Sequence, residues 1–276
     1  MRERSPLRIL TINTWKCDGN YDLRMQALAK QISSLDPDVI TLQESFRTAD
    51  GTVDTAKSLA NALGMHYQFA QARRKTRMLK GLAVESDSGL AMLSRVPIQS
   101  THRLVLPTDS SSEERVALLG ILDWHGVVVK IANVHFTHLP DRMLVKRAQL
   151  SAVLDACSTD AEIDIHTNLI CGDFNTPLHE LRELLAGHNE WTIQDSYVLG
   201  GGESERITIR GIGADWPEAA CIDYILHVRK ATESSTVRFE HSSIVLNQPD
   251  GKTGVFPSDH YGVMTTMHFI KGGEAF

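Results

Sequence analysis

Short apolar runs alternate along the chain with segments in which apolar residues recur every three or four positions. Short apolar runs are typical of buried strands, and the longer spacing is typical of amphipathic helices. Strands are predicted over residues 7–12, 39–42, 89–93, 127–134, 169–171, 221–228 and 262–269. Helices are predicted where Met25, Leu28, Ile32 and Leu35 recur, and over residues 55–63, 142–154 and 178–186.

Residues typical of helix ends lie at the boundaries of these segments. Asp22 is the expected N-cap of the first helix, and Pro37 follows its end. Gly64 lies just past the second helix, and Pro177 precedes the last.

The order of the predicted elements indicates the fold class. Helices interleave with strands without a strict repeat, and several neighbouring strands resemble hairpin partners. This favours mainly antiparallel sheets over a doubly wound parallel sheet. Two sheets packed face to face, with helices outside, explain strands that are apolar on both faces. The polar segments 108–114 and 200–215 are expected to be long surface loops, which are often functional.

Composition narrows the class of protein. The chain has 276 residues, 42% hydrophobic and 22% charged, which excludes disordered, collagen-like and coiled-coil chains. One domain over residues 1–276 is long enough to bury a core without a disulfide or metal. The formal charge of −6 argues against a general binder of duplex DNA or membrane surfaces, although a local basic groove stays open.

The four cysteines indicate a reduced, cytoplasmic protein. Cys17, Cys157, Cys171 and Cys221 form no CxxC pair, which excludes a zinc ribbon, and they are too few for a disulfide scaffold. No apolar stretch reaches the roughly 18 residues of a membrane span, and no signal peptide is recognisable. Export without a leader stays open.

Polar residues recur at the ends of the predicted strands. A single one is usually a turn former, but turn chemistry does not explain six such places in one chain. Because strand ends converge in space, we expect these residues to line one cleft. They are Asn13, Glu44, His135, Asp173 with Asn175, Asp223, and Asp259 with His260.

Seven segments that carry these residues resemble the endonuclease/exonuclease/phosphatase superfamily, which includes exonuclease III, deoxyribonuclease I, sphingomyelinases and inositol polyphosphate 5-phosphatases. Each is short, but all seven appear in family order over nearly the whole chain. They are LTINTW around 11–15, PDVITLQES (37–45), SGLAMLSRVPI (88–98), ANVHF (132–136), ICGDFNTP (170–177), IDYIL (222–226) and PSDHYGV (257–263). The resemblance implies an α+β fold, the four-layer αββα sandwich, and metal-dependent hydrolysis of phosphoester bonds.

The resemblance and the donor chemistry together predict a Mg²⁺ site, with Mn²⁺ as a substitute. Mg²⁺ prefers oxygen ligands and is usually held by one or two carboxylates and several waters. Glu44 is the expected main ligand, and Asn13 and Asp259 are expected to complete the site directly or through water. The competing interpretations are a turn residue for Asn13 and a solvated strand end for Glu44.

The same family pattern implies the catalytic roles. Asp173 resembles the residue that orients or deprotonates the attacking water, and Asn175 is placed to donate a hydrogen bond to the phosphate, since residues i and i+2 of an extended stretch share a face. Asp223 and His260 resemble an Asp–His pair in which the carboxylate fixes the imidazole tautomer and favours the protonated ring. Whether His260 contacts phosphate as a cation or acts as a base stays open. His135 matches a position that contacts phosphate.

Other interpretations of these residues are less favoured than a phosphoesterase site. A zinc site at His135 and His138 is disfavoured, because residues three apart in a strand point to opposite faces and HExxH is absent. Cys171 is expected in the core, and no GxSxG context for a serine triad exists. Asp259 and His260 are adjacent, so both serve one site only if the segment after Pro257 bends.

Three positions depart from the family pattern. Trp15 and Ser88 replace acidic residues found in relatives, which favours a site with one metal ion. Cys221 replaces an arginine, which weakens a substrate contact there.

Two segments bear on the substrate. Residues 73–80 hold five basic residues, Arg73, Arg74, Lys75, Arg77 and Lys80, and are expected in a loop near the cleft rim, either solvated or binding an anion. Residues 206–215 contain Gly211 and Gly213, and Trp216 after them is expected to pack the loop or to stack on a base.

Three classes of function therefore compete. The leading one is a Mg²⁺-dependent phosphoesterase acting on a small phosphodiester or phosphomonoester. The alternative is a metal-dependent nuclease that binds DNA or RNA through the local basic segment. A non-catalytic binding module is disfavoured, since every key position is intact.

Overall fold

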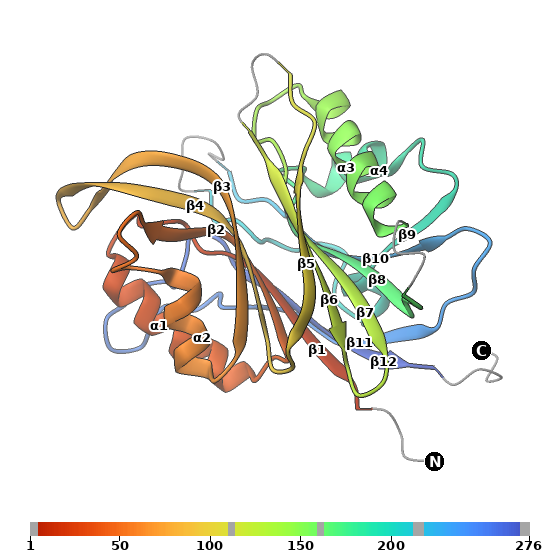
Figure 1. Ribbon diagram of the computed structural model, residues 1–276, viewed down its shortest axis with the longest axis horizontal. Coiled ribbons are helices and arrows are strands. Elements are labelled where there is room, and N and C mark those ends of the chain that lie inside the picture. Colours follow the sequence, from red (N-terminus) through yellow and green to blue (C-terminus); the bar gives the residue numbers. More distant parts are fainter. Residues whose placement is uncertain (1–4, 110–113, 159–162, 212–217, 271–276) are drawn as a thin grey trace.

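Two six-stranded sheets form the body of the computed structural model, which describes residues 5–109, 114–158, 163–211 and 218–270 (Figure 1). The first sheet contains, in spatial order, β11 (Val237–Val245), β12 (Gly262–Phe269), β1 (Leu7–Asn13), β2 (Val39–Thr48), β4 (Leu82–Ser94) and β3 (His66–Leu79). The second contains β5 (Ile98–Val105), β6 (Val116–Asp123), β7 (Val128–His135), β8 (Thr167–Asp173), β10 (Asp223–Lys230) and β9 (Trp191–Asp195). Strands β1 and β2 run parallel, as do β7 and β8, and the remaining pairs are antiparallel, as expected.

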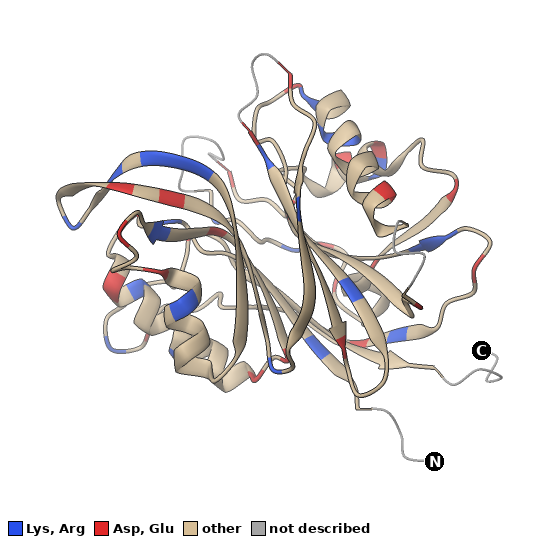
Figure 2. Ribbon diagram, in the orientation of Figure 1, with Lys and Arg blue, Asp and Glu red and all other residues tan. Residues whose placement is uncertain are grey.

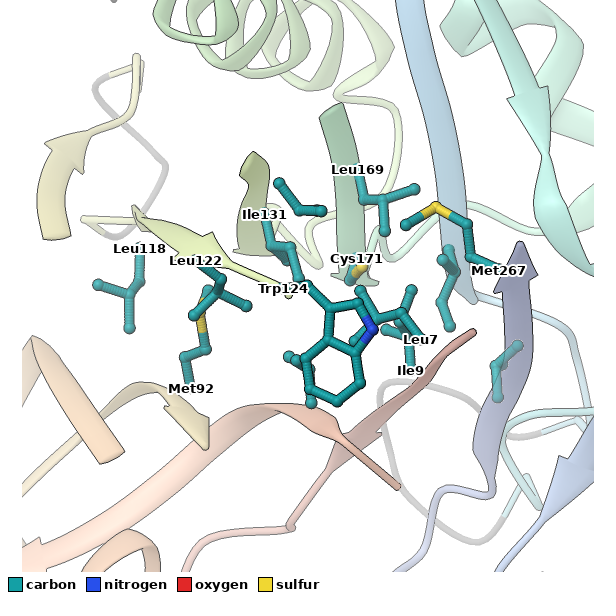
Figure 3. Packing of buried hydrophobic residues seen from close by; sticks show 14 of the residues in the cluster. Leu7, Ile9, Met92, Leu118, Leu122, Trp124, Ile131, Leu169, Cys171 and Met267 are labelled. Atoms are coloured by element: carbon teal, nitrogen blue, oxygen red, sulfur yellow. The ribbon is translucent and has the colours of Figure 1, made fainter. Parts of the chain in front are cut away.

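Alternation along the central strands explains why they are apolar throughout. Leu7 and Ile9 of β1 face the second sheet, whereas Leu10 and Ile12 pack toward the first pair of helices. The core between the sheets joins such residues from both sides, for example Ile9 with Cys171 (Figure 3). Cys171 is fully buried in this core, and burial raises the pKa of its thiol, as expected of a core residue.

Helices cover the outer faces of both sheets. On the first sheet lie α1 (Tyr21–Leu35) and α2 (Thr55–Leu63), and on the second α3 (Met143–Cys157) and α4 (Leu178–Leu185) (Figure 1). A fifth helix, α5 (Ser196–Leu199), is a single turn. This order of layers confirms the αββα sandwich. Within the described ranges, every helix is too short or too polar to cross a membrane.

The predicted helix boundaries agree with the structure to within one residue, except at the start of α1 and at the end of α3, which extends to Cys157 and not to residue 154. The N-cap of α1 is Asn20, whose side chain accepts a hydrogen bond from Leu23 N, so the assignment of this cap to Asp22 was wrong. Asp22 lies in the first turn instead and forms an ion pair with Lys80 at 2.6 Å. Gly64 ends α2 in the left-handed conformation, and Pro177 precedes α4.

The basic run at residues 73–80 lies in a long hairpin and not in a loop, which corrects the prediction. Residues 73–79 belong to β3, which pairs with β4 up to the turn at Lys80 and Gly81. The described parts of segments 108–114 and 200–215 do form loops, whereas Gly213 and Trp216 lie outside the described residues. The hairpin reaches beyond the other strands, with basic residues on β3 and acidic residues on β4 (Figure 2).

Candidate functional site

A cleft of about 480 Å³ brings most of the predicted site residues together. Its lining includes Asn13, Glu44, His135, Asp173, Asn175, Asp259 and His260. Asp223 does not line the cleft; it is fully buried, hydrogen-bonded to His260. The structure therefore places seven of the eight predicted residues in one cleft, and the eighth, Asp223, lies behind His260.

Strand direction explains why these residues meet. Asn13, His135 and Asp173 are the last residues of β1, β7 and β8. Because β10 and β12 run antiparallel to β8 and β1, the beginnings of β10 and β12 lie at the same edge. Asp223 therefore pairs with Asp173 across the sheet, and His260 lies just before β12.

A β-bulge, and not a strand end, directs Glu44 into the cleft. Strand β2 continues to Thr48, and its pairing with β4 shifts between Leu42 and Ser45. Glu44 has a φ of 52°, a left-handed conformation that is uncommon for a residue other than glycine. Across the core, the amide of Asn133 donates to Leu42 O at 2.9 Å and so supports the bulge from the second sheet. The competing interpretation of Glu44 as a solvated strand end is therefore wrong, because its side chain is largely buried.

The segment before β12 bends as required for its two polar residues to share one site. Ser258 Oγ donates to Asn13 O at 2.7 Å and accepts from His260 N at 3.2 Å. Both Asp259 and His260 consequently line the cleft. Loop residue Arg210 donates through its backbone N to Asp259 O at 3.1 Å, which ties the loop after α5 to this segment.

Hydrogen bonds fix both carboxylate oxygens of Asp173. Asn13 Nδ2 donates to Oδ2 at 3.0 Å, and Asn175 N donates to Oδ1 at 2.8 Å. Asn175 reaches the cleft through a turn with a φ of 47°, and not along an extended strand as expected. Its Nδ2 donates to Phe136 O at 3.0 Å, which fixes the orientation of the amide. Burial, followed by the charge of Asp223, raises the pKa of Asp173 above its usual value.

Asp223 and His260 form the predicted pair. His260 Nδ1 lies 2.9 Å from Asp223 Oδ2, so Nε2 points to the cleft side, 3.9 Å from Asp173 Oδ2. Burial alone would lower the pKa of His260, but the carboxylates of Asp223, Asp173 and Asp259 raise it to about 10. The ring is therefore protonated at neutral pH.

His135 and His138 both line the cleft. His135 is the last residue of β7, so His138 lies in the following loop and the two side chains are not on opposite faces of one strand, as had been expected. His138 Nδ1 accepts a hydrogen bond from Arg115 Nη2 at 2.7 Å, which uses one of its ring nitrogens. Burial and the charge of Arg115 lower the pKa of His135, so this ring is neutral.

Two sets of side chains have the chemistry to hold a cation. Among the described residues, Asp173, Asp223 and His260 bring three ligand atoms within 4.8 Å of one another. However, a protonated His260 has no lone pair for a metal, and Mg²⁺ prefers oxygen. Glu44, Asp259 and Asn13 supply oxygens only, and Glu44 raises the pKa of Asp259 after the effect of burial, so the two carboxylates feel each other's charge. This second set fits a hard divalent cation.

The sequence patterns did not identify Lys16 and Arg115 as cleft residues. Lys16 Nζ lies 3.1 Å from Glu44 Oε2, in a loop where Trp15 and Lys16 both have positive φ. Arg115 is nine-tenths buried, just before β6. In the sequence, each of them is a single charged residue outside the recognisable motifs, so no pattern marked it as a cleft residue. Arg73 and Arg77 also line the cleft. The sequence had placed the basic run only in a loop near the rim of the cleft.

Comparisons with known proteins agree with this geometry. The sequence profile of the Endonuclease/Exonuclease/phosphatase family matches residues 10–260. A search of the curated proteins found no match. Solved structures resemble the chain in fold at low identity. One is an endonuclease/exonuclease/phosphatase family protein from Leptotrichia buccalis C-1013-b, with a TM-score of 0.71 and 17% identity, covering 95% of this chain and 100% of that chain.

Two further structures are similar. An endonuclease/exonuclease/phosphatase from Beutenbergia cavernae DSM 12333 has a TM-score of 0.70 and 20% identity, covering 99% of this chain and 74% of that chain. D. rerio TDP2, complexed with single strand DNA product, has a TM-score of 0.69 and 20% identity, covering 96% of this chain and 99% of that chain. At these identities the likeness concerns the fold, whereas the profile covers most of the sequence. The chain therefore belongs to the endonuclease/exonuclease/phosphatase family of divalent-metal-dependent phosphoester hydrolases.

Proposed function

We propose that the protein is a Mg²⁺-dependent phosphoesterase that cleaves a phosphodiester or phosphomonoester by attack of an oriented water. One observation carries the proposal: residues from both sheets meet in one cleft, where an oxygen-donor set lies next to a buried Asp–His pair. A non-catalytic binding module would not need both.

The metal is proposed to bind Glu44, with Asn13 and Asp259 completing the site. When bound, the ion would polarise the phosphoryl oxygens and neutralise developing charge. In the absence of the ion, the Lys16 ammonium supplies a positive charge next to Glu44. Mn²⁺ shares the preference for oxygen ligands and is the expected substitute.

Asp173 is proposed to orient the attacking water and accept its proton. Its two oxygens are held by Asn13 and Asn175, so the carboxylate cannot rotate away. The raised pKa brings it closer to neutrality, which suits a general base that must also release the proton.

His260 is proposed to contact the phosphate as a cation. The pair with Asp223 keeps its ring protonated and fixes Nε2–H toward the cleft. Neutral His135, 3.5 Å from Asp173 through Nε2, and the amide of Asn175 are proposed to complete the contacts to the phosphoryl oxygens. These donors are positioned before substrate arrives, which lowers the cost of stabilising charge in the transition state.

The substrate is proposed to be small or flexible. A volume of about 480 Å³ lies within the range of small-molecule pockets, and the formal charge of −6 disfavours a long duplex. The competing function is a nuclease, which the basic residues of β3 on the cleft wall favour. Salt separates the two, because nucleic-acid affinity falls steeply with salt.

A panel of generic phosphodiesters, nucleotides, phospholipids and oligonucleotides, tested with Mg²⁺ and with EDTA, examines the proposal. We expect metal-dependent hydrolysis that EDTA stops and Mn²⁺ restores. Glu44→Gln, Asp173→Asn and His260→Ala should each lower kcat by at least about 100-fold while thermal melts stay cooperative. Zinc dependence, or full activity of Asp173→Asn, would contradict the assigned ligands or the assigned base.

A further inference from the structure

A row of positive charge runs along the cleft-facing side of β3. Arg73, Lys75 and Arg77 alternate along this strand, and all three line the cleft. Alternate residues of a strand share one face, so the three side chains belong to the same surface. We call these three residues the basic row. Arg115, just before β6, lines the cleft with them.

The hairpin sorts its charges by face. Arg74 lies between members of the basic row but points to the reverse side, where Nε is 2.8 Å from Oδ1 of Asp87 on β4. Thr76 bonds Glu85 on the same reverse side. The cross-strand neighbours of the basic row are instead Ser88, Ser86 and Val84. The carboxylates of β4 therefore face away from the cleft, and Figure 2 shows the two charge types on separate strands of the hairpin.

The cleft-facing cations are crowded and partly fixed. Arg77 donates to Ser86 O at 3.0 Å and to Ser88 Oγ at 2.7 Å, which holds its guanidinium in place. Burial and the charges of Arg115 and Arg77 lower the pKa of Arg73. Holding like charges together costs free energy in the free protein, and a bound anion removes this cost. The arrangement is typical of a site for a phosphate or another strong anion.

The backbone that carries the basic row is longer than a single phosphate. Arg73 and Arg77 lie four positions apart on the strand, which corresponds to about 13 Å between their Cα atoms. The phosphate that is cleaved is assigned to the part of the cleft next to Glu44 and His260, which are not members of the basic row. We propose that the basic row binds a second phosphate group of the substrate, beyond the one that is hydrolysed. This rests on the proposed function for the position of the first phosphate.

Direct binding tests this proposal without turnover. The probes are thymidine 5′-monophosphate, thymidine 3′,5′-bisphosphate and the oligonucleotide dT6, measured by calorimetry in EDTA. We expect the bisphosphate to bind at least about tenfold more tightly than the monophosphate. The variant Arg73→Gln/Lys75→Gln, and to a lesser degree Lys75→Gln alone, should remove most of this difference. The matched control is Lys57→Gln, which removes one charge from an exposed position on α2 outside the cleft lining and should leave it unchanged.

The probes also distinguish the two sources of a second phosphate. One outcome is that dT6 binds more tightly than the bisphosphate, and that the double variant reduces the slope of log K for dT6 against log salt concentration by about 0.7 per lost phosphate contact. The second phosphate then belongs to a single-stranded nucleic acid. If dT6 gains nothing, it belongs to a small bisphosphorylated molecule. The proposal is overturned if the wild type binds the monophosphate and the bisphosphate equally, or binds neither measurably. It is also overturned if the double variant keeps the full difference in affinity between the two. Failure of the proposed function would instead appear as absent metal-dependent hydrolysis.

Discussion

At the scale of single residues, Lys16 places a positive charge next to the proposed main metal ligand, Glu44. The carboxylates and imidazoles of the cleft lie in recognisable motifs, so their positions along the chain were predictable, whereas the place of Lys16 was not. The contact of Lys16 with Glu44 at 3.1 Å depends on a left-handed backbone conformation at Trp15 and Lys16. The pattern of apolar and polar residues does not predict such a conformation. Carboxylates of Glu44 and Asp18 outweigh burial and raise the pKa of Lys16, so it is a permanent cation at the proposed metal ligand.

Lys16→Met should strengthen metal binding. The ammonium competes with a divalent ion for the Glu44 oxygens, and its removal also makes the local potential more negative. We expect Mn²⁺ to bind at least about threefold more tightly, measured by electron paramagnetic resonance of free Mn²⁺. Lys57→Gln should leave the affinity unchanged. Weaker binding by the Lys16 variant would show that the ammonium supports the ligands and does not compete.

Asp223→Asn should move the alkaline limit of activity to lower pH. The folded-state pKa of His260 is raised to about 10, above its unfolded value near 6.5, so the protonated ring contributes stability that is complete below pH 6.5 and is lost as pH rises through about 10. Without the charge of Asp223, the largest contribution that raises this pKa is lost, so the ring deprotonates at a lower pH. We expect kcat/KM of the variant to fall at least about one pH unit sooner than that of the wild type. His241→Gln, at an exposed histidine, is the control.

At the scale of elements, strands and helices with buried faces were predictable, and edge strands were not. Strands β3 and β11 border the first sheet, and β5 and β9 border the second. An edge strand pairs on one side only, so it tolerates exposed polar residues and loses the apolar signal. Interior β6 also escaped prediction, because its unbroken apolar run fits a strand or a helix equally. The bulge at Glu44 depends on support by Asn133 from the other sheet, and local sequence does not encode that contact.

Arg24 of α1 joins two of the loops that carry site residues. Its buried guanidinium donates to the carbonyls of Thr14, Trp15, Lys16, Asp18 and Pro257 at 2.8–3.2 Å. Arg24→Lys keeps the charge but not the fork of donors, and each orphaned buried carbonyl costs about 1–3 kcal/mol. We expect a lower melting temperature and weaker Mn²⁺ binding, because the loops after Asn13 and before Asp259 lose a shared anchor. Gln26→Ala, exposed on the same helix, should change neither. A lower melting temperature with unchanged metal affinity would limit Arg24 to stabilising the fold.

At the scale of the whole molecule, the cleft is a seam between the sheets. The proposed metal ligands Asn13, Glu44 and Asp259 come from the first sheet and its connections. Asp173 and Asp223 come from the second. Three of the side-chain hydrogen bonds described above join the first sheet and its connections to the second sheet: Asn13 to Asp173 at 3.0 Å, His260 to Asp223 at 2.9 Å and Asn133 to Leu42 O at 2.9 Å. Packing of apolar faces brings the sheets together, and the family motifs made this architecture predictable. The relative position of the two sheets at the cleft depends on these hydrogen bonds between residues far apart in the sequence, which local sequence does not predict.

Because the proposed ligands come from three separate parts of the chain, a bound divalent ion should stabilise the whole fold. A ligand that binds only the folded state adds about 2.7 kcal/mol at 100 times its Kd. For a chain of this size that corresponds to a rise in melting temperature of about 5 °C. We expect Mg²⁺ or Mn²⁺ to produce this rise in thermal melts, EDTA to reverse it, and Glu44→Gln to abolish it. Lys57→Gln should retain it. If Glu44→Gln retains the shift and Asp223→Asn abolishes it, the ion binds the cluster of Asp173, Asp223 and His260, and the ligand assignment moves to the second sheet.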